Sequence, residues 1–277
     1  MIDTDQLALA IHNNVSAALR EDIGTGDLSA QLIPADRQAS AYILCREPAI
    51  LCGQAWFEAC FRQLDPDFQI NWHASDGQSI AKNQIVCEFN GNARALLSAE
   101  RSAINFLQTL SATATATHRY VKAVAGLSTV VMDTRKTIPG LRLAQKYAVW
   151  MGGGSNQRTG LFDGILIKEN HIAAAGGIVA ALAATAQASV PVQIEVENMD
   201  ELRLALAAGA KLILLDNFDL AQLRAAVMLT AGCAQLEASG GIALADVRAV
   251  AETGVQRISI GAITKHLHAV DLSMRIN

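Results

Sequence analysis

The 277-residue chain has few of the features that mark membrane, secreted or nucleic-acid-binding proteins. No apolar run approaches the roughly 20 residues that span a bilayer, and the N-terminal segment holds acids but no cationic stretch, which predicts that no signal peptide is present. The formal net charge of -4 provides no basis for binding nucleic acid or a membrane surface. With 51% apolar and 17% charged residues, the composition excludes disorder and suits a globular enzyme.

Cysteine is scarce and scattered. The five cysteines, at positions 45, 52, 60, 87 and 233, are odd in number and include no Cys-x-x-Cys pair. A disulfide framework and a structural zinc site are therefore both disfavoured, and a cytoplasmic location is expected.

The first part of the chain has the pattern of a small α+β domain. Residues 5–20 have apolar side chains at helical spacing, which predicts an amphipathic helix. Residues 39–89 hold three short strand-like runs and one helical stretch at 53–64, without a regular alternation of strand and helix. The Ala-, Leu- and Thr-rich residues 93–125 are long enough for one or two helices that lead into the next part.

From residue 129 onward, strands and helical or loop segments alternate. Six strand candidates begin near residues 129, 164, 192, 212, 235 and 257, and helices are expected around 173–188, 199–208, 219–231 and 244–253. Such βα repeats form a parallel sheet that is either doubly wound or closed into a barrel. Polar residues or glycines follow every one of these strands, as they do at the C-terminal face of a barrel. We therefore expect a barrel that is smaller or less complete than the usual eight-stranded one.

Four cationic side chains follow the first two of these strands. Arg135 and Lys136 come after the first strand, Lys168 comes after the second, and Arg158 lies in the crossover between them. Because the C-terminal ends of parallel strands share one edge of the sheet, we expect these cations on one rim, where α/β proteins bind ligands. In a chain of negative net charge, this cluster predicts a ligand with several negative charges.

The later strands deliver carboxylates. Glu195 and Asp216 lie at the ends of neighbouring strands, where two carboxylates can share a divalent cation or hold sugar hydroxyls. The alternative is an ordinary ion pair with Lys136 or Lys168, and both interpretations can hold at once.

Glycines end the last two strands, in Ser239-Gly240-Gly241 and at Gly261. They let backbone amides approach a phosphate closely, although glycines also simply turn tight corners. Two such corners on adjacent strands favour the phosphate site. The triplet at 152–154 has no Walker or Rossmann spacing and is a weak signal. His171 follows a strand closely and is a candidate site residue, whereas Arg101 alone is typical of a solvated helix charge.

Together these residues resemble the quinolinate phosphoribosyltransferases, and the resemblance covers nearly the whole chain. The motifs that carry it are Arg20-Glu-Asp-Ile-Gly24, Glu100-Arg-Ser-Ala-Ile-Asn-Phe-Leu-Gln108, Asp133-Thr-Arg-Lys-Thr-Ile-Pro-Gly140, Gly152-Gly-Gly-Ser-Asn-Gln-Arg158, Leu166-Ile-Lys-Glu-Asn-His171, Glu195-Val-Glu197, Leu215-Asp-Asn-Phe218, Ser239-Gly-Gly241 and Ile258-Ser-Ile-Gly-Ala-Ile-Thr264. Ordered motifs of this length are far more specific than a lone glycine signature.

The resemblance implies an N-terminal α/β sandwich domain followed by an open α/β barrel of six parallel strands. We assign residues 1–111 to the sandwich, with the tail 268–277 packed on it, and residues 112–267 to the barrel. It also implies a homodimer in which the N-terminal domain of one subunit caps the barrel of the other. The implied reaction, a step of de novo NAD biosynthesis, joins quinolinate to phosphoribosyl pyrophosphate with Mg²⁺, and yields nicotinate mononucleotide, pyrophosphate and CO₂.

The resemblance further assigns roles to individual positions. The catalytic positions, which handle the phosphoribosyl substrate, are Lys136, Glu195 and Asp216, and the two carboxylates are also the metal positions. The substrate-binding positions are Arg101, supplied by the neighbouring subunit, and Arg135, Gln157, Arg158, Lys168 and His171. The phosphate-binding positions are Ser239, Gly240, Gly241, Gly261 and Lys265.

Two residues depart from the family pattern. Gln157 stands where the family often has histidine, and it can donate a hydrogen bond but cannot carry a positive charge. Lys265 also replaces a common histidine, and it keeps a charge that suits phosphate.

Three other functions compete with this interpretation. A related phosphoribosyltransferase would accept a mono-acid such as nicotinate and release no CO₂, but the number of cations favours a dicarboxylate. A barrel aldolase would use Lys168 as a Schiff base, which the surrounding arginines disfavour. A non-catalytic nucleotide-precursor sensor would be expected to lack Glu195 and Asp216, and both are present.

Overall fold

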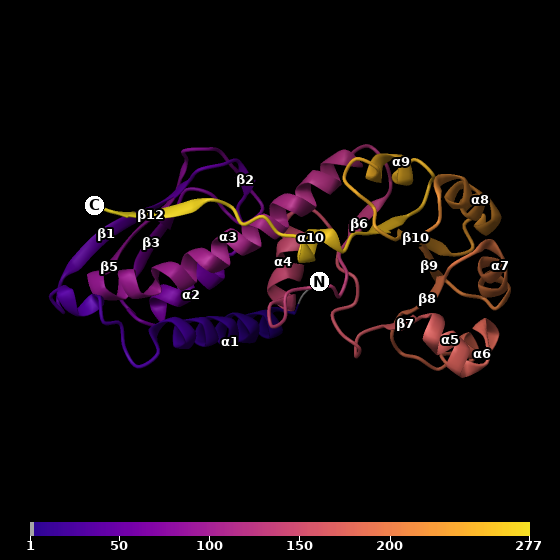
Figure 1. Cartoon of the computed structure of the whole chain (residues 1–277), viewed down its shortest axis with the longest axis horizontal. Coiled ribbons are helices and arrows are strands. Elements are labelled where there is room, and N and C mark those ends of the chain that lie inside the picture. Colours follow the sequence, from indigo (N-terminus) through magenta and orange to yellow (C-terminus); the bar gives the residue numbers. More distant parts are fainter. Residues whose placement is uncertain (1–2) are drawn as a thin grey trace. The chain divides into compact units, whose positions relative to one another are not determined.

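The computed structural model describes residues 3–277, which form two compact units (Figure 1). Unit 1 holds the chain up to His118 together with Thr137–Gly153 and Thr264–Asn277, and unit 2 holds Arg119–Lys136 and Gly154–Ile263. In the part of the chain that the structure describes, no helix is both long and apolar enough to cross a membrane.

Unit 1 is built on an antiparallel sheet of four strands in the order β12-β1-β5-β3. The strands are β1 (Gln38–Cys45), β3 (Gln69–Trp72), β5 (Ile85–Asn92) and β12 (Leu272–Ile276), and β2 (Ala49–Ile50) pairs with β4 (Ser79–Ile80) in a second, small sheet. The C-terminal strand β12 runs along β1, with Leu272 opposite Cys45 and Ile276 opposite Ala41. The end of the chain therefore completes the sheet of the N-terminal part.

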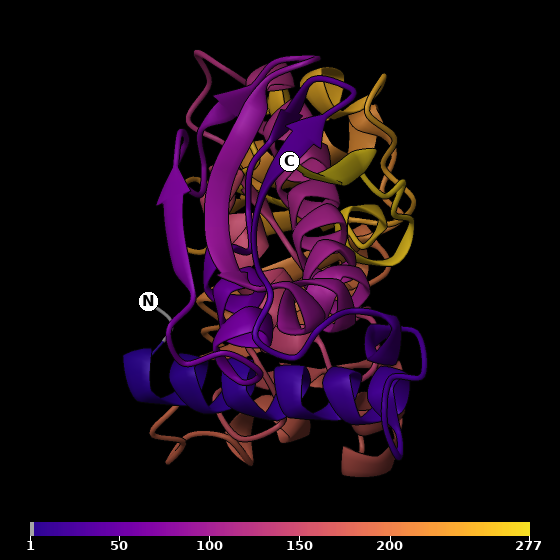
Figure 2. The same ribbon diagram turned by 90° about the vertical axis from the view of Figure 1, so that its left-hand side faces the viewer.

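Five helices and a short 3₁₀ turn accompany this sheet, and the first of them lies across the ends of the upright strands in Figure 2. They are α1 (Thr4–Ile23), the turn η1 (Ala30–Leu32), α2 (Gln54–Arg62), α3 (Ala93–Ala123), α4 (Arg142–Met151) and α10 (Ala262–Lys265). The residues 93–125, for which one or two helices were expected, form the single 31-residue helix α3. Its first turn is capped by Asn92, whose Oδ1 accepts hydrogen bonds from the backbone N–H groups of Arg94 and Ala95 at 3.0 and 3.2 Å.

The crossover helix α4 groups with unit 1, although the sequence placed residues 137–153 inside the barrel domain. Ala144 and Ala148 of α4 are fully buried in the core of unit 1. The Tyr147 hydroxyl donates a 2.8 Å hydrogen bond to Asp76, and the ring of Tyr147 lies 5.6 Å from that of Trp56. These contacts are distant in sequence, so the local helical pattern could not reveal them.

Unit 2 is built on a parallel sheet of six strands in the order β6-β11-β10-β9-β8-β7. The strands are β6 (Val130–Met132), β7 (Ile165–Ile167), β8 (Val192–Val196), β9 (Leu212–Asp216), β10 (Gln235–Ser239) and β11 (Arg257–Ser259). Among residues 3–277, the edge strands β6 and β7 do not pair, so the sheet curves without closing. The open six-stranded architecture expected from the sequence is confirmed.

Helices cover the outer side of this curved sheet (Figure 1). They are α5 (Glu169–Ala175), α6 (Ile178–Ala183), α7 (Met199–Ala207), α8 (Leu220–Thr230) and α9 (Val247–Ala251). The expectation of one helix near 173–188 was wrong. Gly176 and Gly177 adopt φ values of 89° and 121°, which no helix tolerates, and they separate α5 from α6.

Candidate active site

A pocket of about 260 Å³ opens among the C-terminal ends of the unit 2 strands. Its polar lining combines cations, carboxylates, an amide and hydroxyls: Arg135, Lys136, Arg158 and Lys168, then Glu195, Asp216 and Glu237, then Gln157, and finally Thr134, Ser239 and Ser259. The four cations that the sequence placed on one rim therefore share one pocket with Glu195 and Asp216, the two carboxylates predicted at the ends of later strands.

The pairing register of the strands explains why these side chains meet. Glu195 of β8, Leu214 of β9 and Glu237 of β10 are direct partners across adjacent parallel strands. Asp216 and Ser239 are likewise partners, two residues further along β9 and β10. Because alternate residues of a strand point to the same face, these side chains form two successive layers inside the curved sheet.

Asp133 holds the loop that follows β6 to the loop that carries Arg158. Its fully buried carboxylate accepts hydrogen bonds from the Asn156 side chain at 2.8 Å and from the Gln157 backbone N–H at 2.7 Å. Its own backbone N–H donates to the Ser155 carbonyl at 3.1 Å. Sequence analysis assigned no role to Asp133, although a carboxylate directly after a buried strand was the available signal.

The two arginines of the pocket repel one another. Burial lowers the pKa of Arg158 from its ordinary value, and the charge of Arg135 lowers it further. One N–H of the Arg158 guanidinium donates to the Gly164 carbonyl at 2.9 Å, which limits the orientations of the group. An anion between two such guanidinium groups would relieve their repulsion, so the geometry favours a carboxylate or phosphate ligand.

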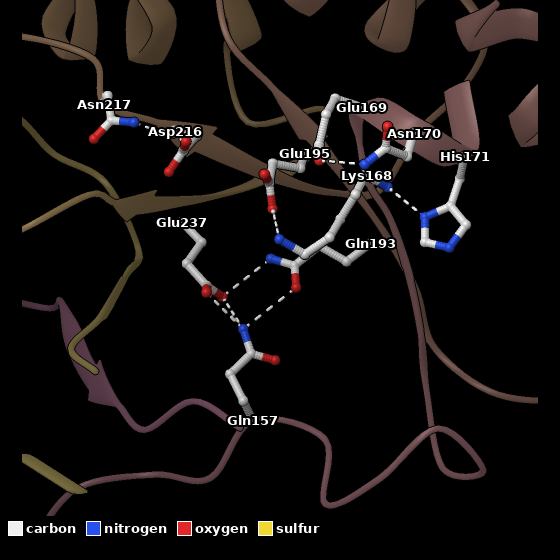
Figure 3. A network of polar contacts seen from close by, with 10 residues as sticks. All are labelled: Gln157, Lys168, Glu169, Asn170, His171, Gln193, Glu195, Asp216, Asn217 and Glu237. Atoms are coloured by element: carbon white, nitrogen blue, oxygen red, sulfur yellow. Dashed lines mark hydrogen bonds and ion pairs between the residues drawn. The ribbon is translucent and has the colours of Figure 1, made fainter. Parts of the chain in front are cut away.

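Lys168 and Glu195 form an ion pair of 3.1 Å inside the pocket (Figure 3). The Glu195 side chain is only 10% exposed, whereas that of Lys168 is 45% exposed. Burial raises the pKa of Glu195, the hydrogen bond and charge of Lys168 oppose this rise, and the charge of Asp216 adds to it. The carboxylate pairing with Lys168 that sequence analysis considered is therefore present, and Asp216 lies close enough to Glu195 to act on it.

His171 lies outside the pocket lining and contacts Lys168 instead. The backbone N–H of Lys168 donates to Nδ1 of His171 at 3.0 Å, where α5 begins. The side chain at the third helical position thus reaches back to the residue before the helix, in the manner of a capping box. His171 sits where it can position Lys168, and in this structure it does not face the pocket.

The His171→Ala variant is expected to lower kcat/KM roughly fivefold, because the cap that fixes Lys168 is worth about 1 kcal/mol. His171→Gln is expected to retain most of the activity, since glutamine at this position makes the same reciprocal hydrogen bond. Steady-state kinetics of the two variants test whether His171 acts by positioning Lys168. Equal losses in both would show that the imidazole itself is needed, and would contradict the positioning role.

Two of the glycines after β10 and β11, Gly240 and Gly261, lie close to other groups. Gly240 has a φ of 111°, and a Cβ there would collide with the side-chain oxygen of Asn217. A Cβ on Gly261 would lie 3.1 Å from Cδ of Lys136, so this glycine makes room for the lysine. Gly240, Gly241 and Gly261 adjoin the pocket residues Ser239 and Lys136 in the chain or in space, but they do not line the pocket themselves.

Two predicted site residues belong to unit 1. Arg101 lies on α3 with its side chain 61% exposed, and its guanidinium is 4.0 Å from the Glu100 carboxylate. Lys265 is the exposed last residue of α10.

The network of amides and a carboxylate around Gln157 includes two residues that the sequence did not single out, Gln193 and Glu237. Gln157 donates to both carboxylate oxygens of Glu237, at 2.6 Å to Oε1, and to Oε1 of Gln193 at 3.3 Å (Figure 3). Gln193 in turn donates to Glu237 at 3.0 Å. The alternation of Gln193 with Glu195 and of Glu237 with Ser239 was the signal that could have revealed these residues.

The carboxylates suit a metal that arrives with a phosphorylated substrate. Within residues 3–277, no group of three or more His, Cys, Asp or Glu side chains is arranged to hold a metal ion. Mg²⁺ is commonly bound through one or two carboxylates together with substrate phosphates and water. Glu195 and Asp216 are compatible with that mode, since one is tied to Lys168 and the other borders the open pocket.

A curved parallel sheet whose C-terminal edge combines four cations with carboxylates defines an enzyme site for small, multiply charged anions. Family models describe the chain almost completely. The quinolinate phosphoribosyl transferase N-terminal domain matches residues 23–111, and the C-terminal domain of the same family matches residues 113–275. The chain therefore belongs to the quinolinate phosphoribosyltransferase family, which confirms the resemblance of its motifs.

Individual relatives agree with the family models. Over 259 residues the chain is 42% identical to the probable nicotinate-nucleotide pyrophosphorylase (carboxylating) of Bacillus subtilis, covering 92% of this chain and 90% of the relative. The solved structure of the nicotinate-nucleotide pyrophosphorylase from Francisella tularensis is 46% identical, with a TM-score of 0.94 over 100% of this chain and 98% of that one. The corresponding protein from Ehrlichia chaffeensis is 33% identical, with a TM-score of 0.92 over 100% and 99% of the two chains.

Proposed function

We propose that this chain is a decarboxylating quinolinate phosphoribosyltransferase, a pentosyltransferase of de novo NAD biosynthesis. It transfers the phosphoribosyl group of phosphoribosyl pyrophosphate (PRPP) to the ring nitrogen of quinolinate. The products are nicotinate mononucleotide, pyrophosphate and CO₂. The observation that carries this proposal is a single pocket, in a chain of this family, that joins four cations to the carboxylates Glu195 and Asp216.

The acceptor is a dianion, and the arginines suit it. Arg135, Arg158 and Lys168 bind the two carboxylates of quinolinate, because the planar guanidinium fork matches a carboxylate with two parallel hydrogen bonds. The mutual repulsion of Arg135 and Arg158 is relieved when the dianion binds. Gln157 and His171 belong to the same side of the site and act on the acceptor through their neighbours Arg158 and Lys168.

The donor, PRPP, carries more negative charge than quinolinate and binds at the ends of the later strands. Ser239, with the backbone of Gly240 and Gly241, binds phosphate together with Gly261 and Lys265. Lys136, Glu195 and Asp216 handle the ribose and pyrophosphate. Glu195 and Asp216 would hold Mg²⁺ brought with PRPP, and the metal would supply positive charge that neutralises the pyrophosphate leaving group.

The chemistry needs no covalent nucleophile, and we assign none. As the bond to pyrophosphate breaks, positive charge develops on the ribose, and Glu195 or Asp216 stabilises it electrostatically while the ring nitrogen forms the new bond. The ring nitrogen then carries a positive charge. That charge stabilises the carbanion left when the adjacent carboxylate departs as CO₂, and a proton completes the product.

The assembly proposed is a cytoplasmic homodimer in which Arg101 reaches the acceptor site of the neighbouring subunit. The exposed Arg101 side chain, with only a 4.0 Å contact to Glu100, is available for such a role. The Schiff-base alternative is disfavoured because the amine of Lys168 contacts the Glu195 carboxylate at 3.1 Å and shares its pocket with two arginines.

Turnover of the purified protein with PRPP and Mg²⁺ tests the proposal, with quinolinate and nicotinate offered separately while CO₂ and nucleotide are followed. We expect nucleotide and CO₂ from quinolinate and neither from nicotinate. Product from nicotinate alone would show that the protein is instead a phosphoribosyltransferase that accepts a mono-acid. The absence of nucleotide and CO₂ with both acceptors would overturn the proposed activity.

A further inference from the structure

Glu237 is a buried carboxylate in the middle of the candidate active site. It is only 1% exposed, it lies on β10, and it is in register with Leu214 and through it with Glu195. It lines the pocket together with the four cations. A buried carboxylate is costly unless it is paired or well hydrogen-bonded, so its partners indicate its purpose.

The partners of Glu237 are amides rather than cations. Gln157 donates to both of its oxygens and Gln193 donates to Oε2 at 3.0 Å, and within residues 3–277 no ion pair involves Glu237. Both amide groups turn their N–H atoms toward the Glu237 oxygens, which accept these hydrogen bonds. The Nε2 group of Gln157, which also reaches Gln193, is thereby committed to the network.

Residue 157 is consequently held at two points by two different carboxylates. Asp133 accepts its backbone N–H at 2.7 Å, and Glu237 accepts its side chain. The next residue in the chain is Arg158, which lines the pocket. The orientation of the Arg158 side chain therefore depends on a loop segment that Glu237 holds from strand β10.

We infer that Glu237 is a positioning residue: by accepting hydrogen bonds from Gln157 and Gln193 it anchors the Gln157–Arg158 segment and so sets acceptor binding. What position 157 must supply is a hydrogen-bond donor toward Glu237, and a positive charge is not required there. Gln157 acts on quinolinate through this anchor rather than by donating to it. The inference rests on the proposed function.

Exchanging the donor and the acceptor tests the anchor. Gln157→Glu sets two carboxylates against each other, and Glu237→Gln replaces one of two accepting oxygens with a donor that faces the Gln157 and Gln193 amides. Each is expected to raise KM for quinolinate by about 10²-fold, the usual effect of a small misplacement of a binding group. The double variant E237Q/Q157E restores a donor–acceptor pair with reversed polarity. It is expected to recover at least tenfold relative to either single variant, with kcat changed much less than KM.

The variants Gln157→His and Gln157→Leu distinguish the effect of the hydrogen bond donated to Glu237 from the effect of side-chain size at position 157. Histidine keeps an N–H toward Glu237 and leucine has none, so Q157H is expected to retain clearly more activity than Q157L. Glu252→Gln, on the surface of unit 2, is the matched control for a lost carboxylate. Thermal unfolding of the single and double variants is a measurement that needs no turnover. The changes in unfolding temperature caused by the substitutions at 157 and 237 should not add up in the double variant.

The outcomes are distinct for the two proposals. An inactive wild-type protein would refute the proposed function, while non-additive unfolding temperatures at 157 and 237 would still support the anchor. An active wild-type protein whose double variant is no better than the single variants would overturn the anchor. A fall in kcat alone in E237Q, with KM unchanged, would also overturn it, because Glu237 would then act on the reacting atoms.

Discussion

Replacing Arg135 with alanine is expected to abolish turnover with quinolinate while leaving the fold intact. Arg135 lies in the pocket beside Arg158, close enough for its charge to lower the pKa of that residue. Removing one member of a desolvated charge pair costs on the order of 10³-fold in affinity or rate. The loss is expected in kcat/KM for quinolinate, since a carboxylate of the substrate would be left without its bidentate partner.

Steady-state kinetics with thermal unfolding checks this result. Arg224→Ala, on the exposed face of α8, is the matched control and should leave both activity and unfolding temperature unchanged. Arg135→Lys keeps the charge but loses the fork, so an intermediate activity is expected. Near-normal turnover in Arg135→Ala would refute the assignment of the acceptor site. Should that variant unfold, Arg135→Lys with wild-type kinetics would refute it equally.

Lys168→Met is expected to produce the second large loss, again on the order of 10³-fold in kcat/KM. Glu195 would lose the cation that lies 3.1 Å away in a site where its side chain is 10% exposed. Burial already raises the pKa of Glu195 and Lys168 lowers it, so the variant raises that pKa further. The carboxylate then becomes protonated at a higher pH than in the wild-type protein.

A pH profile of kcat/KM distinguishes this mechanism from simple loss of a substrate contact. The acidic limb of the profile should move to higher pH in Lys168→Met and stay in place in Lys168→Arg, which keeps the charge. Lys82→Met, in an exposed turn of unit 1, is the control for the loss of a lysine. An acidic limb that does not move would mean that Glu195 does not need to be ionised for turnover.

Local patterns in the sequence predicted most of the architecture. The six strands of unit 2 begin within about one residue of the positions that apolar runs and turn signals indicated, because buried parallel strands are continuous apolar segments bounded by polar ends. Three of the four cations of the pocket were also predictable, since Arg135, Lys136 and Lys168 follow strand ends in the chain. Where a local signal was overlooked, as at Gly176 and Gly177, the helix assignment failed.

Side-chain partners could not be predicted in the same way. The sequence shows that Gln193 alternates with Glu195, and Glu237 with Ser239, but not which strand lies next to which. Only the register of β8, β9 and β10 brings Glu195 and Glu237 into one layer. Likewise, the spacing of His171 suggested a substrate contact, whereas the structure turns its ring back to the Lys168 backbone.

The sequence by itself therefore determined the class of fold, the order of its elements and the chemistry gathered at one rim, because these depend on periodicity and on residues close together in the chain. The tertiary structure alone decided that β12 completes the sheet begun by β1, that α4 packs in unit 1, and that Gln157 is bound by Glu237. These are contacts between segments far apart in sequence. They arise from register and packing, which no local pattern encodes.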